Sequence, residues 1–128
     1  MRLLVDTQIL IWSTTAPELN PKKAQLQLED ESNSLWFSVA SLWEVAVKRS
    51  LNKPDFLIDV GPLRDSLFDA GFEELPVQAS HVLCLTGLQR FHKDPFDRLL
   101  LAQAVAEGMV LLTTDRVLAK YEGPITLV

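Results

Sequence analysis

Short apolar runs that alternate with helical segments constrain this chain more than any other feature. We expect buried strands at five places: 2–5, 35–37, 72–75, 109–113 and 125–128. The run Met109–Thr113 is apolar almost throughout, as in strands that are buried on both faces. The alternation therefore predicts an α/β fold, with a parallel sheet between two layers of helices.

The helical segments fall between these strands. They are expected from Ile9 to Ala16 and over 21–31, 38–51, 57–70, 80–89, 95–108 and 116–121. The segment 38–51 is the most amphipathic, and its apolar face is predicted from the residues Val39, Leu42, Trp43, Ala46, Val47 and Leu51. Proline at 95 and glycine at 108 mark the start and end of the strongest helix.

Length and cysteine content limit the class of protein. The chain has 128 residues, which fits one domain spanning residues 1–128. Cys84 is its only cysteine, so an intrachain disulfide and a cysteine-based zinc cluster are both excluded. The acid at Asp6 comes too early for a signal peptide, and no apolar run is long enough to span a membrane. We therefore expect a cytoplasmic protein that does not cross a membrane.

The net charge of −5 is concentrated in one segment. Residues 54–79 contain six acids and one base, whereas the rest of the chain contains eleven of each. A protein with this balance does not bind nucleic acid through its bulk electrostatics. Any contact with nucleic acid must therefore come from a local site.

Four acids stand at the junctions between predicted strands and helices. They are Asp6, Glu44, Asp97 and Asp115. In a parallel sheet these junctions share one edge, where ligands bind. Carboxylates held close together need a counter-charge, and Mg²⁺ or Mn²⁺ supplies one through oxygen ligands. A divalent ion that also orients a water molecule is suited to phosphodiester hydrolysis.

Each acid also has a structural explanation. Asp6, Asp94 and Asp115 are good helix N-caps, and Asp97 suits the positive end of a helix. The spacing of Ser41 and Glu44 fits a capping box. All of these explanations remain open at this point.

The histidines and tryptophans are expected to be structural. His81 and His92 are isolated in the sequence, so we assign them structural or surface roles and not metal ligation. Trp12, Trp36 and Trp43 lie in apolar patterns, which favours core or interface positions over base stacking.

Four segments carry a resemblance to a known family. They read LLVDTQILIW (3–12), SVASLWEVAVK (38–48), HKDPFDRLLLAQA (92–104) and LLTTD (111–115). In this order and at these separations, the chain resembles the PIN-domain family of metal-dependent ribonucleases, and within it the VapC-type toxins of toxin–antitoxin pairs. The resemblance implies a Rossmann-like three-layer α/β/α sandwich with a mostly parallel sheet.

The resemblance also implies a site and partners. An acidic pocket of Asp6, Glu44, Asp97 and Asp115 would hold Mg²⁺ or Mn²⁺ and hydrolyse RNA. The partners would be a cognate antitoxin and commonly a second copy of the chain. Asp97 matches the family's third acid because an apolar helical run follows it, so Asp94 is assigned to the cap, outside the pocket. Gln8 departs from close relatives, which often have histidine there.

Polar and basic residues beside the acids are candidates for substrate contact. Lys48 follows Glu44 by one helical turn, and Arg98 and Arg116 each directly follow a site acid. Thr7, Thr113 and Thr114 could orient metal-bound water. The competing explanations are an ion pair between Lys48 and Glu44, solvated arginines, and threonines that cap helices.

Two other functions compete with the ribonuclease hypothesis. A receiver-like signalling domain has a similar size and binds Mg²⁺ at strand ends, but this chain lacks its adjacent acid pair and its late lysine. A PIN-like module that has lost catalysis and only binds is the second alternative. The complete set of acids argues against it.

Overall fold

A sheet of five parallel strands forms the centre of the molecule, in the order β3-β2-β1-β4-β5. The computed structural model describes residues 1–90 and 92–128. The strands are β1 (Arg2–Val5), β2 (Ser34–Ser38), β3 (Glu73–Leu75), β4 (Val110–Thr113) and β5 (Ile125–Leu127). The α/β class and the sandwich are thus confirmed, and the sheet is wholly parallel.

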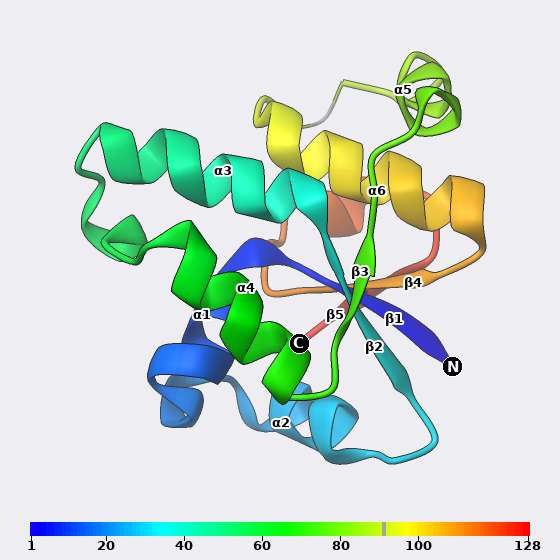
Figure 1. Ribbon diagram of the computed structural model, residues 1–128. Coiled ribbons are helices and arrows are strands. Elements are labelled where there is room, and N and C mark those ends of the chain that lie inside the picture. The colour runs from blue at the N-terminus through cyan, green and yellow to red at the C-terminus, as the bar shows by residue number, and fades with distance from the viewer. Residues whose placement is uncertain (91) are drawn as a thin grey trace.

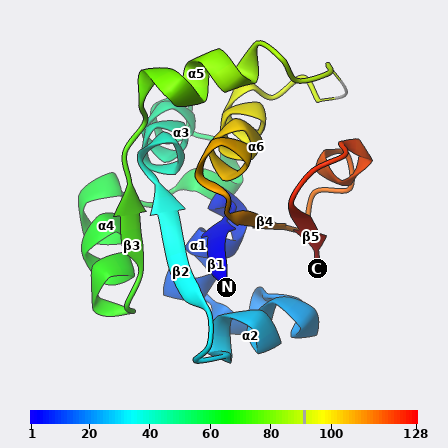
Figure 2. The same ribbon diagram turned by 90° about the vertical axis from the view of Figure 1, so that its right-hand side faces the viewer.

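Helices cover both faces of the sheet (Figures 1 and 2). The α-helices are α1 (Thr7–Thr15), α2 (Lys22–Glu29), α3 (Val39–Ser50), α4 (Val60–Asp69), α5 (Ala79–Leu85) and α6 (Pro95–Glu107). The described residues also form three single turns of 3₁₀-helix, at Pro17–Leu19, Pro54–Phe56 and Leu118–Lys120. Among the described residues, no helix combines the length and the apolar character needed to cross a lipid bilayer.

Two hydrophobic cores lie on opposite faces because strand side chains alternate. From β1, Leu3 and Val5 join the core under α1 and α4, whereas Leu4 joins the core under α6. Helix α3 continues beyond the end of β2 and contacts α1, α4 and α6. It therefore borders the edge of the sheet at which the strands end.

The chain reverses its direction of winding between β1 and β4. It adds β2 and β3 on one side of β1, and then β4 and β5 on the other. In parallel sheets, ligands bind outside the carboxyl ends of the two strands at this reversal. Asp6 follows β1 and Asp115 lies two residues after β4. This strand order also differs from the 2-1-3-4-5 order of receiver domains, which excludes that alternative.

Several predicted helices are shorter than expected, among them α4 and the segment 116–121. Helix α4 begins at Val60 and not at Leu57. Proline fits only the first turn of a helix, so Pro62 prevents an earlier start. Its Leu63 and Leu67 are buried, so α4 is also part of the core and not only a surface helix. The segment 116–121 is reduced to the 3₁₀ turn at Leu118–Lys120.

The predicted apolar face of α3 is only partly right: Leu42 is buried in the core as expected, but other members are not. Glu44 and Val45 are buried, whereas Trp43 is 58% exposed and Ala46 also faces solvent. The periodicity was misleading because two polar residues, Ser41 and Glu44, belong to the inner face. Trp43 stays on the surface, where its ring meets the ring of Phe96 edge-on at 4.8 Å.

The predicted capping box is also wrong. Ser38 is the N-cap of α3, and its hydroxyl accepts the N–H of Ala40 at 2.9 Å. Ser41 and Glu44 lie inside the helix, so neither is needed at its start. Their side chains are thus available to the site described below.

Candidate metal centre

A hollow of about 130 Å³ opens where β1 and β4 end, and acids surround it. We call it the acid pocket. Five carboxyl side chains line it: Asp6, Glu44, Asp94, Asp97 and Asp115. The rest of its wall comes from Thr7, Gln8, Lys48, Phe56 and Thr114. The structure thus brings together the four predicted site acids, although they come from four separate parts of the chain.

Asp6 is fixed from three directions. One carboxylate oxygen accepts the N–H of Ile9 at 3.0 Å, which makes Asp6 the N-cap of α1. The other accepts the Thr113 hydroxyl at 2.6 Å and the Thr114 N–H at 3.2 Å. Asp6 is only 5% exposed, and this burial raises its pKa despite the three hydrogen bonds.

Glu44 and Lys48 form an ion pair inside the acid pocket. The Lys48 Nζ lies 2.5 Å from one oxygen of Glu44, and the Thr7 hydroxyl donates to the other at 2.6 Å. A second ion pair joins Lys48 to Asp94 at 3.4 Å. Burial lowers the pKa of Lys48, but its bonds and charges with the two acids outweigh burial and raise it. Lys48 therefore stays charged and balances one carboxylate.

The charged form of Asp97 is also unfavourable in the folded protein. Burial is the largest cause that raises its pKa, to about 7, and the charges of Asp94 and Glu44 add to it. Asp94 caps α6 as predicted, since it accepts the N–H of Phe96 at 2.9 Å. However, its predicted place outside the pocket is wrong, because it also lines the wall beside Lys48.

His92 also belongs to the site, which corrects its assignment as an isolated histidine. Its Nε2 lies 2.7 Å from Asp115 and 3.2 Å from Asp97. Its Nδ1 accepts the N–H of Asp94 at 3.0 Å, so in the neutral ring Nε2 carries the hydrogen. In that state the Nε2–H donates to Asp115 beside Asp97, and the ring has no free nitrogen lone pair for a metal.

Asp115 is held in its charged form. Burial raises its pKa, but the hydrogen bonds from His92 and from the N–H of Val117 prevail and lower it. The carboxyl of Asp115 is therefore ionised over a wide pH range. Its N–H also donates to the hydroxyl of Thr113, which in turn bonds Asp6. Thr113 thus fixes acids at the ends of both central strands.

The predicted substrate-contact residues separate into two groups. Lys48, Thr7 and Thr114 line the acid pocket, where they bond its carboxylates. Arg98 and Arg116 lie outside it: Arg98 is partly buried on α6, and Arg116 is exposed on the neighbouring surface. Any role of the two arginines is thus indirect or lies beyond the pocket.

The acids of the pocket fit a hard divalent cation. Five carboxyl groups face one lysine and one histidine among the described residues that border the pocket. One oxygen of Asp97 and one of Asp115 lie within 4.8 Å of each other beside His92, so two carboxylates converge at one point. Carboxylate oxygens are the ligands that Mg²⁺ and Mn²⁺ prefer, and the surplus negative charge favours a cation.

This fold and pocket define a class of protein: an α/β domain with a carboxylate site where its parallel sheet reverses. The PIN domain family model matches residues 3–124. The chain therefore belongs to the PIN domain family, which consists of nucleases that use divalent metal ions. No curated protein matches the chain in sequence.

Solved structures share the fold over nearly the full length. VapBC2 from Rickettsia felis, bound to a DNA fragment from its promoter, has a TM-score of 0.70, with 17% identity over 99% of this chain and 98% of that one. DNA-bound VapBC from Salmonella typhimurium gives 0.67, with 14% identity over 98% and 97%. VapBC-1 from nontypeable Haemophilus influenzae gives 0.63, with 13% identity over 99% and 98%.

Proposed function

We propose that this protein is an endoribonuclease that depends on Mg²⁺ or Mn²⁺ and acts as the toxin of a toxin–antitoxin pair. The observation that carries the proposal is the acid pocket, in which carboxylates from the ends of β1 and β4 meet those of α3 and α6. Membership of a nuclease family and a surplus of buried negative charge both support it.

Asp6, Glu44, Asp97 and Asp115 would hold the metal. A bound divalent ion would supply an activated water and a positive charge for the phosphate. The surrounding residues prepare the acids for this task. Thr113 and the backbone of Thr114 fix Asp6, Thr7 and Lys48 fix Glu44, and His92 holds Asp97 and Asp115 together. Gln8 lines the same pocket without changing its set of acids.

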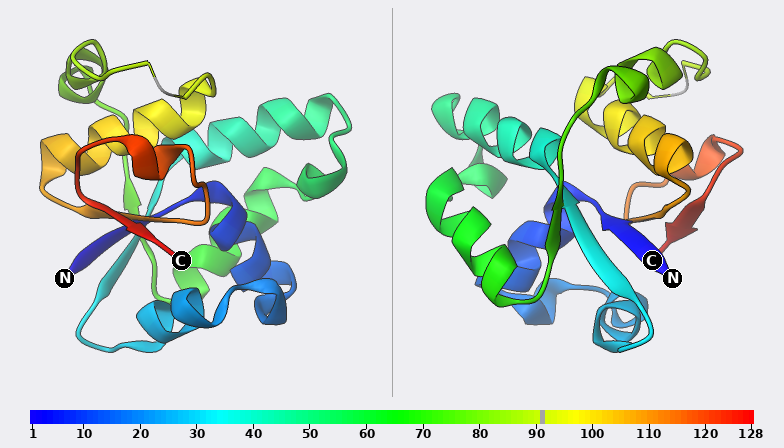
Figure 3. Two further views of the ribbon diagram at one scale, coloured as in Figure 1. Left: turned by 180° about the vertical axis from the view of Figure 1, so that it is seen from behind. Right: turned by 45° about the vertical axis from the view of Figure 1, so that its right-hand side comes forward.

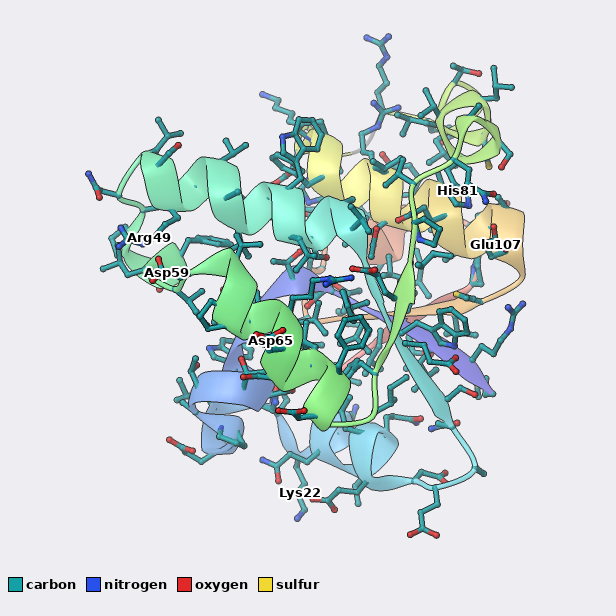
Figure 4. All side chains as sticks on the ribbon, viewed as in Figure 1. Lys22, Arg49, Asp59, Asp65, His81 and Glu107 are labelled. Atoms are coloured by element: carbon teal, nitrogen blue, oxygen red, sulfur yellow. The ribbon has the colours of Figure 1, made fainter. Side chains whose placement is uncertain are left out.

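An RNA cleavage assay tests this function. Fluorescently labelled single-stranded RNA is incubated with the protein in Mg²⁺, in Mn²⁺ and in EDTA. We expect cleavage only with metal, and a loss of at least about a hundredfold for Asp97→Asn and for Asp6→Asn. Asp65→Asn is the matched control, because Asp65 is an exposed acid on α4 (Figure 4). Metal-independent cleavage, or equal rates in all variants, would reject the proposal in favour of a PIN-like binding module.

An antitoxin is the proposed partner. The similar structures from Rickettsia felis, Salmonella typhimurium and Haemophilus influenzae are all named as VapBC complexes. An inhibitor that enters the acid pocket must bring positive charge, and arginine matches carboxylates with two parallel hydrogen bonds. We expect an antitoxin arginine or lysine to pair with a pocket acid, and its change to alanine to restore cleavage more than it weakens the complex.

We also propose that the protein forms a homodimer, which sedimentation in solution tests.

A further inference from the structure

Three cations surround a second hollow that adjoins the acid pocket. Lys22 and Lys23 come from the start of α2, and Arg116 follows β4. The hollow has a volume of about 420 Å³, and Leu127 of β5 forms part of its wall. Thr114 lines both hollows, so the two share a boundary. We call this second hollow the basic groove.

The fold creates the basic groove from distant parts of the sequence. Helix α2 lies beside the carboxyl end of β5 in every view (Figures 1, 2 and 3). Figure 4 shows Lys22 at the base of the molecule, on α2. Arg116 reaches the same hollow because Thr114 and Arg116 continue from β4, the neighbour of β5.

The three cations of the basic groove form no ion pair with another described residue. Lys48, Arg49 and Arg64 have acidic partners. Within residues 1–90 and 92–128, no ion pair involves Lys22, Lys23 or Arg116. All three are exposed, so their positive charge is available to a ligand in solution.

The excess of acidic residues is concentrated on another side of the molecule. The acidic segment 54–79 forms α4 and β3, at the edge of the sheet opposite to β5 (Figure 2). The overall charge of −5 therefore does not describe the side that carries the basic groove. A polyanion would be repelled from the β3 edge and attracted to the β5 edge.

We propose that the basic groove binds the phosphate backbone of single-stranded RNA on one side of the bond cut in the acid pocket. This inference rests on the proposed nuclease function. Lys22, Lys23 and Arg116 supply positive charge for phosphates, and Thr114 marks the point where the strand passes from one hollow to the other. These contacts position the strand without reading its bases.

RNA fits this arrangement better than an acidic peptide does. A peptide that continued from the basic groove would bring carboxylates towards five acids. An RNA strand brings phosphates instead, and a divalent cation held by those acids would supply positive charge for the next phosphate. One RNA strand would therefore match the positive charge of the basic groove and the proposed cation of the acid pocket at the same time.

Binding of a labelled RNA tests the proposal. A fluorescein-labelled 12-nucleotide oligouridine is titrated in Mg²⁺ with protein that carries Asp97→Asn, to prevent cleavage. Lys22→Gln, Lys23→Gln and Arg116→Gln are added singly and together. Each lost contact should weaken binding about fivefold at 0.1 M salt and reduce the slope of log K against log salt by about 0.7. The triple variant should lose roughly a hundredfold.

Lys120→Gln is the matched control, since Lys120 is exposed on the 3₁₀ turn Leu118–Lys120 and lines neither hollow. It should leave both the affinity and the salt slope unchanged. Thermal unfolding of each variant confirms that the fold is intact. Equal losses for Lys120→Gln and the groove variants would show only a general charge effect, and would overturn the proposal.

Cleavage by the protein with Asp97 intact separates this inference from the proposed function. If that protein cuts RNA and the triple groove variant binds and cuts it equally well, the nuclease stands and the groove proposal fails. If that protein cuts no RNA but the groove variants still lose binding, the nuclease fails, and only the phosphate contacts of the groove stand, without their place beside a cut bond. Competition by a poly-glutamate peptide as strong as that by RNA would assign the groove to an acidic protein and overturn the proposal.

Discussion

The two histidines of this protein have the same local bonding but different surroundings. In both, Nδ1 accepts a backbone N–H at 3.0 Å, from Gln78 for His81 and from Asp94 for His92. In both, Nε2 faces a carboxylate: Glu107 at 2.8 Å for His81, and Asp115 at 2.7 Å for His92. Figure 4 shows His81 and Glu107 side by side where α5 meets α6.

The surroundings decide what each histidine does. His81 is fully buried, and Gln103 links its ring region to Ser38 and to the backbone of Pro76. At this place the single carboxylate of Glu107 is paired with a single donor, the Nε2–H of His81, so charge and donors are balanced. Around His92 several carboxylates compete for few donors, and the pKa of Asp97 rises to about 7 through burial and the nearby acids. A network in which each carboxylate has a donor holds helices together, whereas an excess of carboxylates over donors favours the binding of a cation.

The largest effect is expected from His81→Ala. It removes the donor to Glu107 and opens a cavity between α5 and α6, so the free energy of unfolding should fall by about 3 kcal/mol. Urea unfolding measures this loss. Val82→Ala is the control, because Val82 is 48% exposed on the same helix. A loss below about 1 kcal/mol would show that the network does not stabilise the fold.

A smaller effect of opposite sign is expected from Asp97→Asn. The pKa of Asp97 is raised from 3.8 to about 7 by burial first and then by the neighbouring acids, so the folded state holds its proton more tightly than the unfolded state. Native stability is therefore lost as pH rises from about 4 to about 7. Asn avoids this loss. At pH 8 the free energy of unfolding of the metal-free variant should be higher by about 2 kcal/mol, which is about half of the free energy that the full pKa shift of Asp97 represents.

Thermal unfolding at several pH values checks this sign. The advantage of Asp97→Asn should be greatest at pH 8, smaller at pH 5 and absent near pH 4. The control Asp65→Asn changes an exposed acid of α4 and should show no such trend. An advantage that is constant with pH would contradict the account.

The smallest effect is expected from His92. His92→Ala removes the Nε2–H that donates to Asp115 and lies beside Asp97, and the metal-free protein should lose about 1 kcal/mol. His92→Gln offers an N–H₂ group in its place and should lose less. Because a divalent ion replaces the missing donor, Mn²⁺ should raise the melting temperature more in His92→Ala than in the unchanged protein. An equal or smaller rise would show that His92 does not offset the charge of the acids.

The sequence predicted the parts of this structure that depend on neighbouring residues. Short apolar runs located the five strands, and the junctions of β1 and β4 located Asp6 and Asp115. The role of His92 was missed because it depends on a turn that places its Nδ1 on the N–H of Asp94. The inner face of α3 was misplaced in part, because the buried Glu44 faces the acid pocket and not the core.

The basic groove was beyond prediction for a different reason. Lys22 and Arg116 are far apart in the sequence, and only the order of β1, β4 and β5 brings α2 beside the residues after β4. Arg116 was proposed as an RNA contact from its position next to Asp115, whereas no local pattern distinguished Lys22 from other surface lysines.

The central claim is that the surplus acids around His92 hold a divalent cation. Titration of Mn²⁺ into the metal-free protein at pH 7.5, with free Mn²⁺ followed by electron paramagnetic resonance, tests it without any substrate. We expect saturable binding that Asp97→Asn weakens at least about tenfold, while Asp65→Asn leaves it unchanged. No saturable binding, or equal binding by all three proteins, would contradict the account.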